Sequence, residues 1–448
     1  MVALGLSVAT PAPTSTRGSA PPNVVVITLD TVRRDHMGCY GYGRPTTPRM
    51  DDLAGKGTLY TRAYCSSSWT IPTHASLFTG RNPFEHGAHA FDVPEGTGNN
   101  VNPLPETAIT LAEILRGRGY ATCAMVSNQA YLSRRWQINQ GFDAYYVQPV
   151  IGRLLNNRVL AWVSANRNRP FFLFVNYMDA HRPYNTEPVP GTNWAPVAGG
   201  ESALLDSLYN AVMPDTGAVP ADLVKNIVDQ YDMAVANVDA AAGQVVDRLR
   251  QLGIYDNTVI VVVSDHGEFF GEHHLVEHSK DLYEEALAAA LIVKGAGQLE
   301  GATDGRLVSS TDVPGLILEH FPETWAGEKA QFPDLPGNHE VVAELYYSRI
   351  RDLFNPIWGH RFSRIRTVII DWPFKFISSS DGRNELYDLS ADPREAVDLT
   401  DERADISADL EARLLAFFAG RIRSGERVEQ IPLTEDEIRR LNSLGYIE

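Results

Sequence analysis

The chain alternates short, continuous apolar runs with longer segments in which apolar residues recur every three or four positions. Continuous apolar runs of about four to eight residues are typical of strands buried on both faces, and the longer recurrence is typical of amphipathic helices. The predicted strands are NVVVITL (23–29), ATCAMVS (121–127), FFLFVNY (171–177), TVIVVVS (258–264) and AALIVK (289–294). The helical patterns cover residues 107–119 and 231–253. Strands that alternate with helices predict an α/β fold, in which a mostly parallel sheet is sandwiched by helices.

Polar residues directly follow three of these strands. Asp30 follows the first strand, Asn176 to Tyr184 end and follow the third, and Ser264 to Glu268 end and follow the fourth. In open α/β sheets, ligands bind beyond the carboxyl ends of the strands. We therefore expect these three sets of residues to meet in one crevice.

The pattern changes twice further along the chain. Residues 185–225 are rich in Pro and Gly and lack periodicity, which predicts a loop insertion over the crevice. From about residue 346, the pattern favours short antiparallel strands with a turn at 380–382, followed by two helical stretches. The expected organisation is a flexible tail (1–22), a catalytic α/β domain (23–345) and a smaller C-terminal α+β subdomain (346–448).

Charge and cysteine usage exclude several classes of protein. The chain has 39 Lys and Arg against 56 Asp and Glu, a formal net charge of −17, and no basic run, so we expect no nucleic-acid partner. Its three cysteines are odd in number and lack metal-type spacing, which argues against disulfides and against a zinc–thiolate site. They are expected to be small buried hydrophobic residues.

The sequence also bears on location and partners. No apolar run reaches the roughly 18 residues of a membrane-spanning helix, so we expect no membrane partner. The first residues lack the basic start of a signal peptide, which favours a cytoplasmic location. Whether the chain forms a homo-oligomer is left open.

The segment TIPTHASLFTGR (70–81) has the character of a helix N-terminus that presents a side chain to an anion. A proline follows Thr70 by two residues, and a helical pattern then runs to Gly80. Taken alone, Thr70 is either a helix N-cap or a reactive hydroxyl. Cys65 is a second candidate nucleophile, so the register of this segment decides the chemistry.

Three side chains at strand ends form a candidate metal site. Asp30, Asp265 and His266 offer two carboxylates and one imidazole, which suit Mn²⁺, Zn²⁺ or Mg²⁺ better than Ca²⁺ because Ca²⁺ prefers oxygen ligands alone. Thr70 would complete a set of four ligands, and a bound metal lowers the pKa of a hydroxyl and so makes it a better nucleophile. The alternative is that Ser-Asp-His at 264–266 merely ends a strand.

Three further side chains are candidates for contact with a substrate. His181 follows a strand and could protonate a leaving group. His278 and Lys280 could hold the non-bridging oxygens of an ester. Each of the three could equally be a solvated loop residue.

Five blocks of the sequence follow the order of a known superfamily. They are NVVVITLDTVRRDHMGCYGY (23–42), THASLFTGRNPFEHG (73–87), MDAHRPY (178–184), DNTVIVVVSDHGEFFGEHHLVEHSKDLYEEALAAALIV (256–293) and NELYDLSADPRE (384–395). Together they resemble the sulfatase branch of the alkaline phosphatase superfamily, over most of the chain. The resemblance implies the superfamily's fold, metal site and hydrolysis of esters.

The resemblance also sets the register of the nucleophile segment. The family nucleophile is Cys or Ser in the pattern Cys, any residue, Pro, Ser, Arg, and it is oxidised to formylglycine. Pro72 and residues 75–77 fix the alignment, so Thr70 stands in the nucleophile position and Cys65 lies five residues too early. Threonine cannot become formylglycine, and what remains resembles relatives that use a threonine nucleophile.

Three positions depart from the family pattern: His74 stands where the family has Arg, Thr31 where it has a second Asp, and Asn176 where relatives often carry His. A second metal site would need Asp179, His181 and His278. The resemblance does not favour that second site, because Asn176 takes the place of a ligand.

These observations predict a metal-dependent hydrolase that acts on a small-molecule phosphate or phosphonate ester through a covalent phospho-threonine at Thr70. Three alternatives stay open. They are hydrolysis of sulfuric esters without formylglycine, transfer of a phosphoryl group to an alcohol, and a binding module that has kept only the fold.

Overall fold

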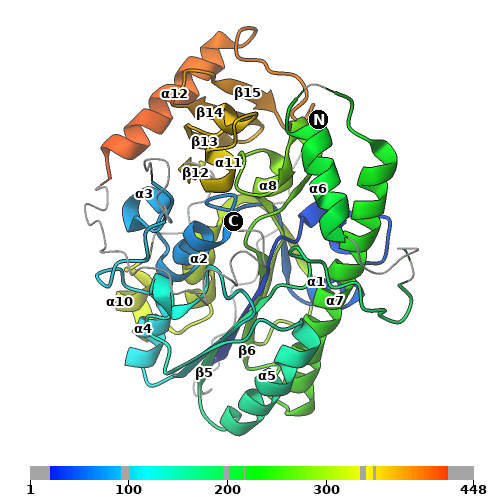
Figure 1. Cartoon of the computed structure of the whole chain (residues 1–448). Helices are drawn as coiled ribbons and strands as arrows, with labels where there is room; N and C mark the ends of the chain where they lie inside the picture. Colours follow the sequence, from blue (N-terminus) through cyan, green and yellow to red (C-terminus); the bar gives the residue numbers. More distant parts are fainter. Residues whose placement is uncertain are drawn as a thin grey trace, which may run out of the picture.

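The computed structural model describes residues 21–91, 101–192, 194, 201–215, 217–332, 340–346 and 350–421. Most of the expected N-terminal tail and the second of the two C-terminal helical stretches lie outside these residues. The centre of the described chain is a large sheet with the strand order β11-β2-β10-β6-β1-β5-β3-β4, in which β9 also pairs with β2 (Figure 1). Its strands are β1 (Asn23–Leu29), β2 (Thr58–Tyr64), β3 (Ala121–Val126), β4 (Ala144–Val147), β5 (Phe171–Tyr177), β6 (Thr258–Ser264), β9 (Ala288–Ala289), β10 (Leu291–Lys294) and β11 (Ala302–Ser309).

The large sheet is mostly parallel, as the sequence predicts. β1 lies between β5 and β6 and is parallel to both. The run at 289–294 is the exception, since β10 pairs antiparallel with β6 and with β2. The chain between β6 and β10 contains no long crossover helix, only short pieces such as α8 (Glu284–Leu287). A strand that returns beside its predecessor without a crossover runs antiparallel to it.

Both faces of the sheet are covered, which explains why its strands read as continuous apolar runs. In β1, Val24 and Val26 belong to one core, while Val25 and Ile27 belong to the other. Helices α2 (Thr70–Thr79), α4 (Leu111–Gly117) and α9 (Val313–Leu318) contribute to the first core. Helices α1 (Pro48–Ala54), α5 (Gly152–Asn166) and α7 (Ala221–Gln251) contribute to the second.

The segment at 185–225 is not the loop that its composition predicts. Residues Glu201–Val212 form helix α6, and α7 begins at Ala221, ten residues before the predicted start. Leu205, Leu208 and Val212 of α6 are fully buried in the second core. The helical spacing of these apolar residues is hidden because few apolar residues surround α6 in the sequence. Packing against α7 stabilises the helix.

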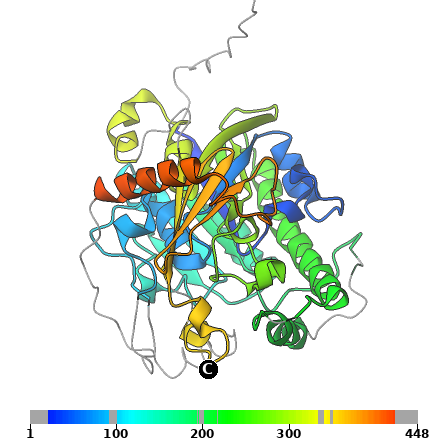
Figure 2. The ribbon, with the colours of Figure 1, turned by 90° about the horizontal axis from the view of Figure 1, so that it is seen from above.

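A small antiparallel sheet follows in the chain, with the strand order β12-β13-β14-β15. Its strands are β12 (Val341–Tyr346), β13 (Ile365–Asp371), β14 (Phe374–Ser379) and β15 (Glu385–Asp388). It therefore begins before the expected boundary at 346, and the turn at 380–382 joins β14 to β15. Figure 2 shows α12 (Ala404–Ala419) lying across this sheet, where Leu410 and Leu414 pack on one face. The other face joins the first core of the large sheet.

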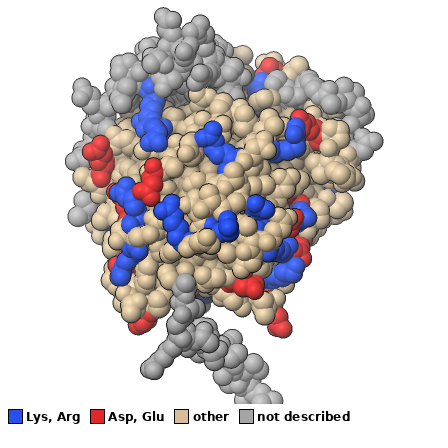
Figure 3. Space-filling view, turned by 90° about the horizontal axis from the view of Figure 1, so that it is seen from below, with Lys and Arg blue, Asp and Glu red and all other residues tan. Residues whose placement is uncertain are grey.

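The surface carries basic side chains in spite of the net negative charge of the chain. Lys and Arg gather on the face seen from below in Figure 3. Arg116 of α4 and Arg248 and Arg250 of α7 lie in the last turns of their helices. Cations at a helix C-terminus interact favourably with the helix dipole, so these arginines stabilise α4 and α7. In the described parts of the chain, no helix has the length and apolar character needed to cross a membrane.

Candidate active site

The register of two neighbouring strands brings the predicted metal ligands together. Leu29, the last residue of β1, pairs with Ser264, the last residue of β6. Asp30 and Asp265 therefore leave the sheet at the same level, and His266 follows. One ligand atom from each of Asp30, Asp265 and His266 lies within 4.8 Å of the other two, and all three side chains are fully buried.

Asp30 directs one oxygen to the protein and leaves the other for a ligand. Its Oδ2 accepts hydrogen bonds from Asn128 Nδ2 at 2.9 Å and from Asn176 Nδ2 at 3.2 Å. Its Oδ1 is buried and has no hydrogen-bond partner among the described residues. The two amides thus fix the orientation of the carboxylate and leave Oδ1 directed into the site.

Asp265 is arranged in the same way. Its Oδ1 accepts the backbone N–H groups of Thr31 at 3.1 Å and His266 at 2.9 Å, while Oδ2 is buried without a hydrogen-bond partner among the described residues. Burial, and then the charge of Asp30, raise the pKa of Asp265 well above its usual range. Two buried carboxylates that face each other with one orphaned oxygen each call for a cation between them.

His266 supplies the third donor. Its Nδ1 lies 3.0 Å from the carbonyl oxygen of Gly267, so a neutral ring donates there and leaves the Nε2 lone pair for a ligand. Burial lowers the pKa of His266 to about 4, which keeps the ring neutral at physiological pH. Two carboxylate oxygens and one neutral imidazole nitrogen fit a divalent cation of the Mn²⁺, Zn²⁺ or Mg²⁺ type.

Thr70 is the first residue of α2 and faces this cluster. Trp69, and not Thr70, occupies the N-cap position, so the interpretation of Thr70 as an N-cap is wrong. The Oγ1 of Thr70 lies 3.5 Å from His266 Nε2 and 3.5 Å from Asn128 Nδ2. The helix ends at Gly80, which adopts a left-handed conformation (φ 67°), as the sequence predicts. The helix N-terminus therefore directs its positive dipole end and a hydroxyl at the same point.

Neither the position nor the pKa of the Cys65 thiol is that of a nucleophile. Its side chain is fully buried, and its Sγ lies 3.6 Å from the carbonyl oxygen of Ser264. Burial raises the pKa of the thiol well above its usual value, and the thiolate is the reactive form. Cys123 is buried as expected, whereas Cys39 is only partly buried.

His74 and Thr31, two of the three positions that depart from the family pattern, form hydrogen bonds within the protein. His74 is fully buried, with Nδ1 2.8 Å from the carbonyl oxygen of Thr70, and burial lowers its pKa to about 4. Thr31 donates its hydroxyl to backbone carbonyl oxygens, including that of Ala180 at 2.7 Å. Neither side chain adds a charge to the site.

Of the remaining predicted residues, the two histidines lie beside the cluster and Lys280 binds elsewhere. The His278 ring centroid is 4.5 Å from that of His266 and 5.1 Å from that of His181. Lys280 is buried and forms an ion pair with Asp352 of α11 (Ile350–Leu353). The Lys280 ammonium is thus held by a partner from the C-terminal part of the chain.

Asp179 does not join a second metal site. Its oxygens accept the N–H of Gly152, at 2.8 Å for Oδ2, and the amide of Asn185, at 2.7 Å for Oδ1. These contacts hold the carboxylate at the start of α5. The alternative of a second site built from Asp179, His181 and His278 therefore gains no support from the structure.

Asn128 is a site residue that the sequence prediction missed. It follows β3, and its side-chain amide nitrogen contacts Asp30 Oδ2 and Thr70 Oγ1. Its backbone N–H also donates to Asn176 Oδ1 at 3.0 Å. The rule that selects polar residues after each buried strand, applied to 121–127, would have found it.

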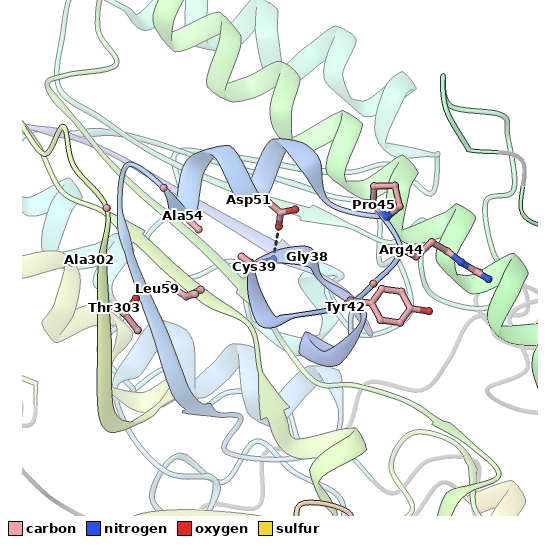
Figure 4. A pocket seen from close by; sticks show the side chains of 13 residues that line it. Gly38, Cys39, Tyr42, Arg44, Pro45, Asp51, Ala54, Leu59, Ala302 and Thr303 are labelled. Atoms are coloured by element: carbon pink, nitrogen blue, oxygen red, sulfur yellow. Dashed lines mark hydrogen bonds between the residues drawn. The ribbon is translucent and has the colours of Figure 1, made fainter.

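A separate groove lies beside α1. It has a volume of about 720 Å³ and is lined mainly by residues 38–45, by α1 and by residues 301–303. In Figure 4, Asp51 accepts a hydrogen bond from the backbone N–H of Cys39 inside the groove. None of the predicted site residues lines it, so the groove is not the catalytic site.

Comparison with known proteins identifies a chain with this fold and cluster as a hydrolase of ester bonds. The Sulfatase family model matches residues 22–323, and the chain belongs to this family. Members of the family are metal-dependent, in agreement with the donor set.

Individual relatives are distant. Arylsulfatase K of Bos taurus is 22% identical over 458 residues, which cover 88% of this chain and 81% of that protein. Arylsulfatase A of Homo sapiens is 34% identical over 130 residues, which cover 29% of this chain and 23% of that protein. The crystal structure of phosphonate monoester hydrolase of Agrobacterium radiobacter has a TM-score of 0.67 at 18% identity and covers 92% of this chain and 99% of its own. That structural likeness supports the fold.

Proposed function

We propose that this protein hydrolyses phosphate or phosphonate esters through a covalent intermediate on Thr70. The observation that carries the proposal is the position of the Thr70 hydroxyl, at the N-terminus of α2 and 3.5 Å from Nε2 of His266, the third member of the cluster. A threonine side chain cannot be converted to formylglycine. A direct attack by the hydroxyl is therefore the route that this site offers.

The residues of the chain then have the following roles. Asp30, Asp265 and His266 would hold a divalent cation, which would lower the pKa of the Thr70 hydroxyl and attract the ester anion. The Thr70 oxygen attacks phosphorus and its proton passes to solvent, the bond to the leaving oxygen breaks, and His181 donates a proton to that oxygen. Water next attacks phosphorus and gives a proton to His181, the bond to Thr70 breaks, and the Thr70 oxygen takes a proton back from solvent.

The second half of the cycle favours phosphorus over sulfur. Formylglycine carries a second hydroxyl that expels sulfate without attack at sulfur, and Thr70 has none. Release must come from water that attacks the central atom. The N-terminus of α2, together with a cation if one is bound, would assist this step best when the transferred group carries more than one negative charge.

Hydrolysis of sulfuric esters is the second candidate. It is favoured by the names of the relatives, because arylsulfatase K and arylsulfatase A are both called sulfatases. In this case too, Thr70 would be the nucleophile, and the slow step would be release of sulfo-threonine.

A comparison of matched substrates tests the proposal. The specificity constant kcat/KM is measured for nitrophenyl esters of a phosphonate, a phosphate and a sulfate, with the Thr70→Ala variant as background. We expect both phosphorus esters to be turned over much faster than the sulfate. Repeated turnover with a preference for sulfate would overturn the substrate assignment and leave the fold and the donor set standing.

A further inference from the structure

The loop that carries His278 has an unusual backbone. Glu277 and Ser279, on either side of His278, adopt left-handed conformations with φ angles of 60° and 58°. Residues with a Cβ atom rarely adopt this conformation, and they keep it only where surrounding contacts impose it. The contacts of Glu277 and Ser279 therefore show what determines the position of His278.

Glu277 is held from two directions. Its side chain is 4% exposed, and its Oε1 accepts a hydrogen bond from Arg182 Nη1 at 3.0 Å. Its Oε2 accepts the hydroxyl of Tyr209 at 2.8 Å. Arg182 belongs to the turn after β5, and Tyr209 belongs to α6. On the other side of His278, the N–H of Ser279 donates to the carbonyl oxygen of Ser68 at 3.0 Å, two residues before Thr70.

Arg182 connects the two histidines. Its carbonyl oxygen lies 2.7 Å from His181 Nδ1 and accepts the N–H of that ring nitrogen. Its guanidinium group binds Glu277, which precedes His278. One residue thus anchors both loops, and the rings of His181 and His278 stand 5.1 Å apart with an interplanar angle of 62°.

We propose that Glu277 is a positioning residue that, together with Arg182 and Tyr209, sets His278 beside His181 and next to the cluster of Asp30, Asp265 and His266. The proposal rests on the proposed function, in which His181 acts on the ester, and on the expectation that His278 holds a non-bridging oxygen of the same ester. It also gives α6 a role, because Tyr209 connects the segment at 201–212 to the active site. The competing explanation is that Glu277 only anchors α6 to the body of the protein.

The Glu277→Gln variant tests the proposal with little disturbance. Glutamine keeps the size of the side chain, and Arg182 keeps its ion pair with Asp206 at 2.8 Å. Misplacing a catalytic group by about 1 Å can cost about 100-fold in rate. We therefore expect kcat to fall about 10-fold to 100-fold with a smaller change in KM, while the metal content and the thermal midpoint stay close to those of the wild type.

A double-mutant cycle separates positioning from anchoring. If Glu277 acts through His278, Glu277→Gln has almost no further effect on kcat in a His278→Ala background. The matched control is Asp229→Asn. Asp229 is a nearly buried carboxylate on α7, and this change removes its ion pair with Arg44. The control variant is expected to keep wild-type kcat.

The outcomes distinguish this inference from the proposed function. Independent losses that multiply in the double variant, or wild-type kcat in Glu277→Gln, overturn the positioning role alone. Full activity of His181→Ala would remove the role that the proposed function gives His181, and full activity of His278→Ala would remove the expected contact of His278 with the ester. If Glu277→Gln does not fold, Tyr209→Phe provides the same test, because it removes only the hydroxyl that donates to Glu277. A loss of kcat there that disappears in the His278→Ala background supports the proposal, and an unchanged kcat contradicts it.

Discussion

Replacement of Asp265 by asparagine is expected to stabilise the metal-free protein and to remove most of the stabilisation that a bound cation gives. In the absence of a cation, the carboxylates of Asp30 and Asp265 face each other in a fully buried site. The introduced asparagine keeps an Oδ1 that accepts the N–H groups of Thr31 and His266, as the aspartate does. Its amide nitrogen replaces the orphaned Oδ2 and can donate toward Asp30 Oδ1.

The size of the effect follows from the geometry. The ligand atoms of the cluster lie within 4.8 Å of one another. At that separation, two unit charges repel each other by about 3.5 kcal/mol if the effective dielectric constant is about 20. The metal-free variant is therefore expected to be more stable than metal-free wild type by about 3 kcal/mol near neutral pH. With a cation at about 100 times its dissociation constant, the wild type gains about 2.7 kcal/mol and the variant gains little.

The difference should depend on pH with a defined sign. The pKa of Asp265 is raised in the folded protein, so protonation of this group stabilises the fold. That contribution is fully present below the unfolded pKa of about 4 and is lost as pH rises through the folded pKa. The advantage of metal-free Asp265→Asn should therefore be small near pH 4 and grow as pH rises.

Denaturant unfolding of chelator-treated protein, with and without added Mn²⁺, measures this difference at each pH. The reasoning would be refuted if the metal-free variant were no more stable than the metal-free wild type at neutral pH. It would also be refuted if Mn²⁺ stabilised both proteins equally.

Three other experiments test separate parts of the site. In a nitrophenyl ester assay, Cys65→Ser should keep most of the activity while Thr70→Ala loses several orders of magnitude in kcat, because only Thr70 faces the cluster. The reverse result would show that the register is wrong. His181→Ala should slow an alkyl ester about 10²-fold to 10⁴-fold but a nitrophenyl ester much less, because only the poor leaving group needs a proton. Equal losses on the two esters would point to a role in orientation instead. Lys280→Met should lower the free energy of unfolding by about 3 to 5 kcal/mol, because it removes the buried cation that forms an ion pair with the buried carboxylate of Asp352. Adding Asp352→Asn should recover part of this loss, and no recovery in denaturant unfolding would contradict the pairing.

The sequence predicted the sheet and the meeting of Asp30 with Asp265 and His266 because these features follow from local patterns. A continuous apolar run predicts a buried parallel strand, and the residue after it lies at the carboxyl edge of the sheet. Thr70 was placed by the register of its segment, and α2 begins at that residue.

Features that depend on distant contacts were missed. Helix α6 has a weak pattern and is stabilised by packing on α7, which composition does not reveal. The partners of Lys280 and Glu277 lie 72 and 95 residues away in sequence, so their pairing could not be inferred from spacing. Asn128 does not depend on a distant contact. It directly follows β3, as Asp30 follows β1, so the same rule predicts it once the rule is applied to that strand.

The covalent role of Thr70 is tested most directly by the mass of enzyme quenched during turnover of a nitrophenyl phosphonate. The account predicts that wild-type protein gains the mass of one phosphonyl group, that the gain lies on the peptide containing residues 70–81, and that Thr70→Ala shows none. To separate Thr70 from its neighbour, Cys65→Ser is measured in parallel and is expected to carry the same adduct. An adduct that disappears in Cys65→Ser, or one that persists in Thr70→Ala, would contradict the assignment of Thr70 as the nucleophile.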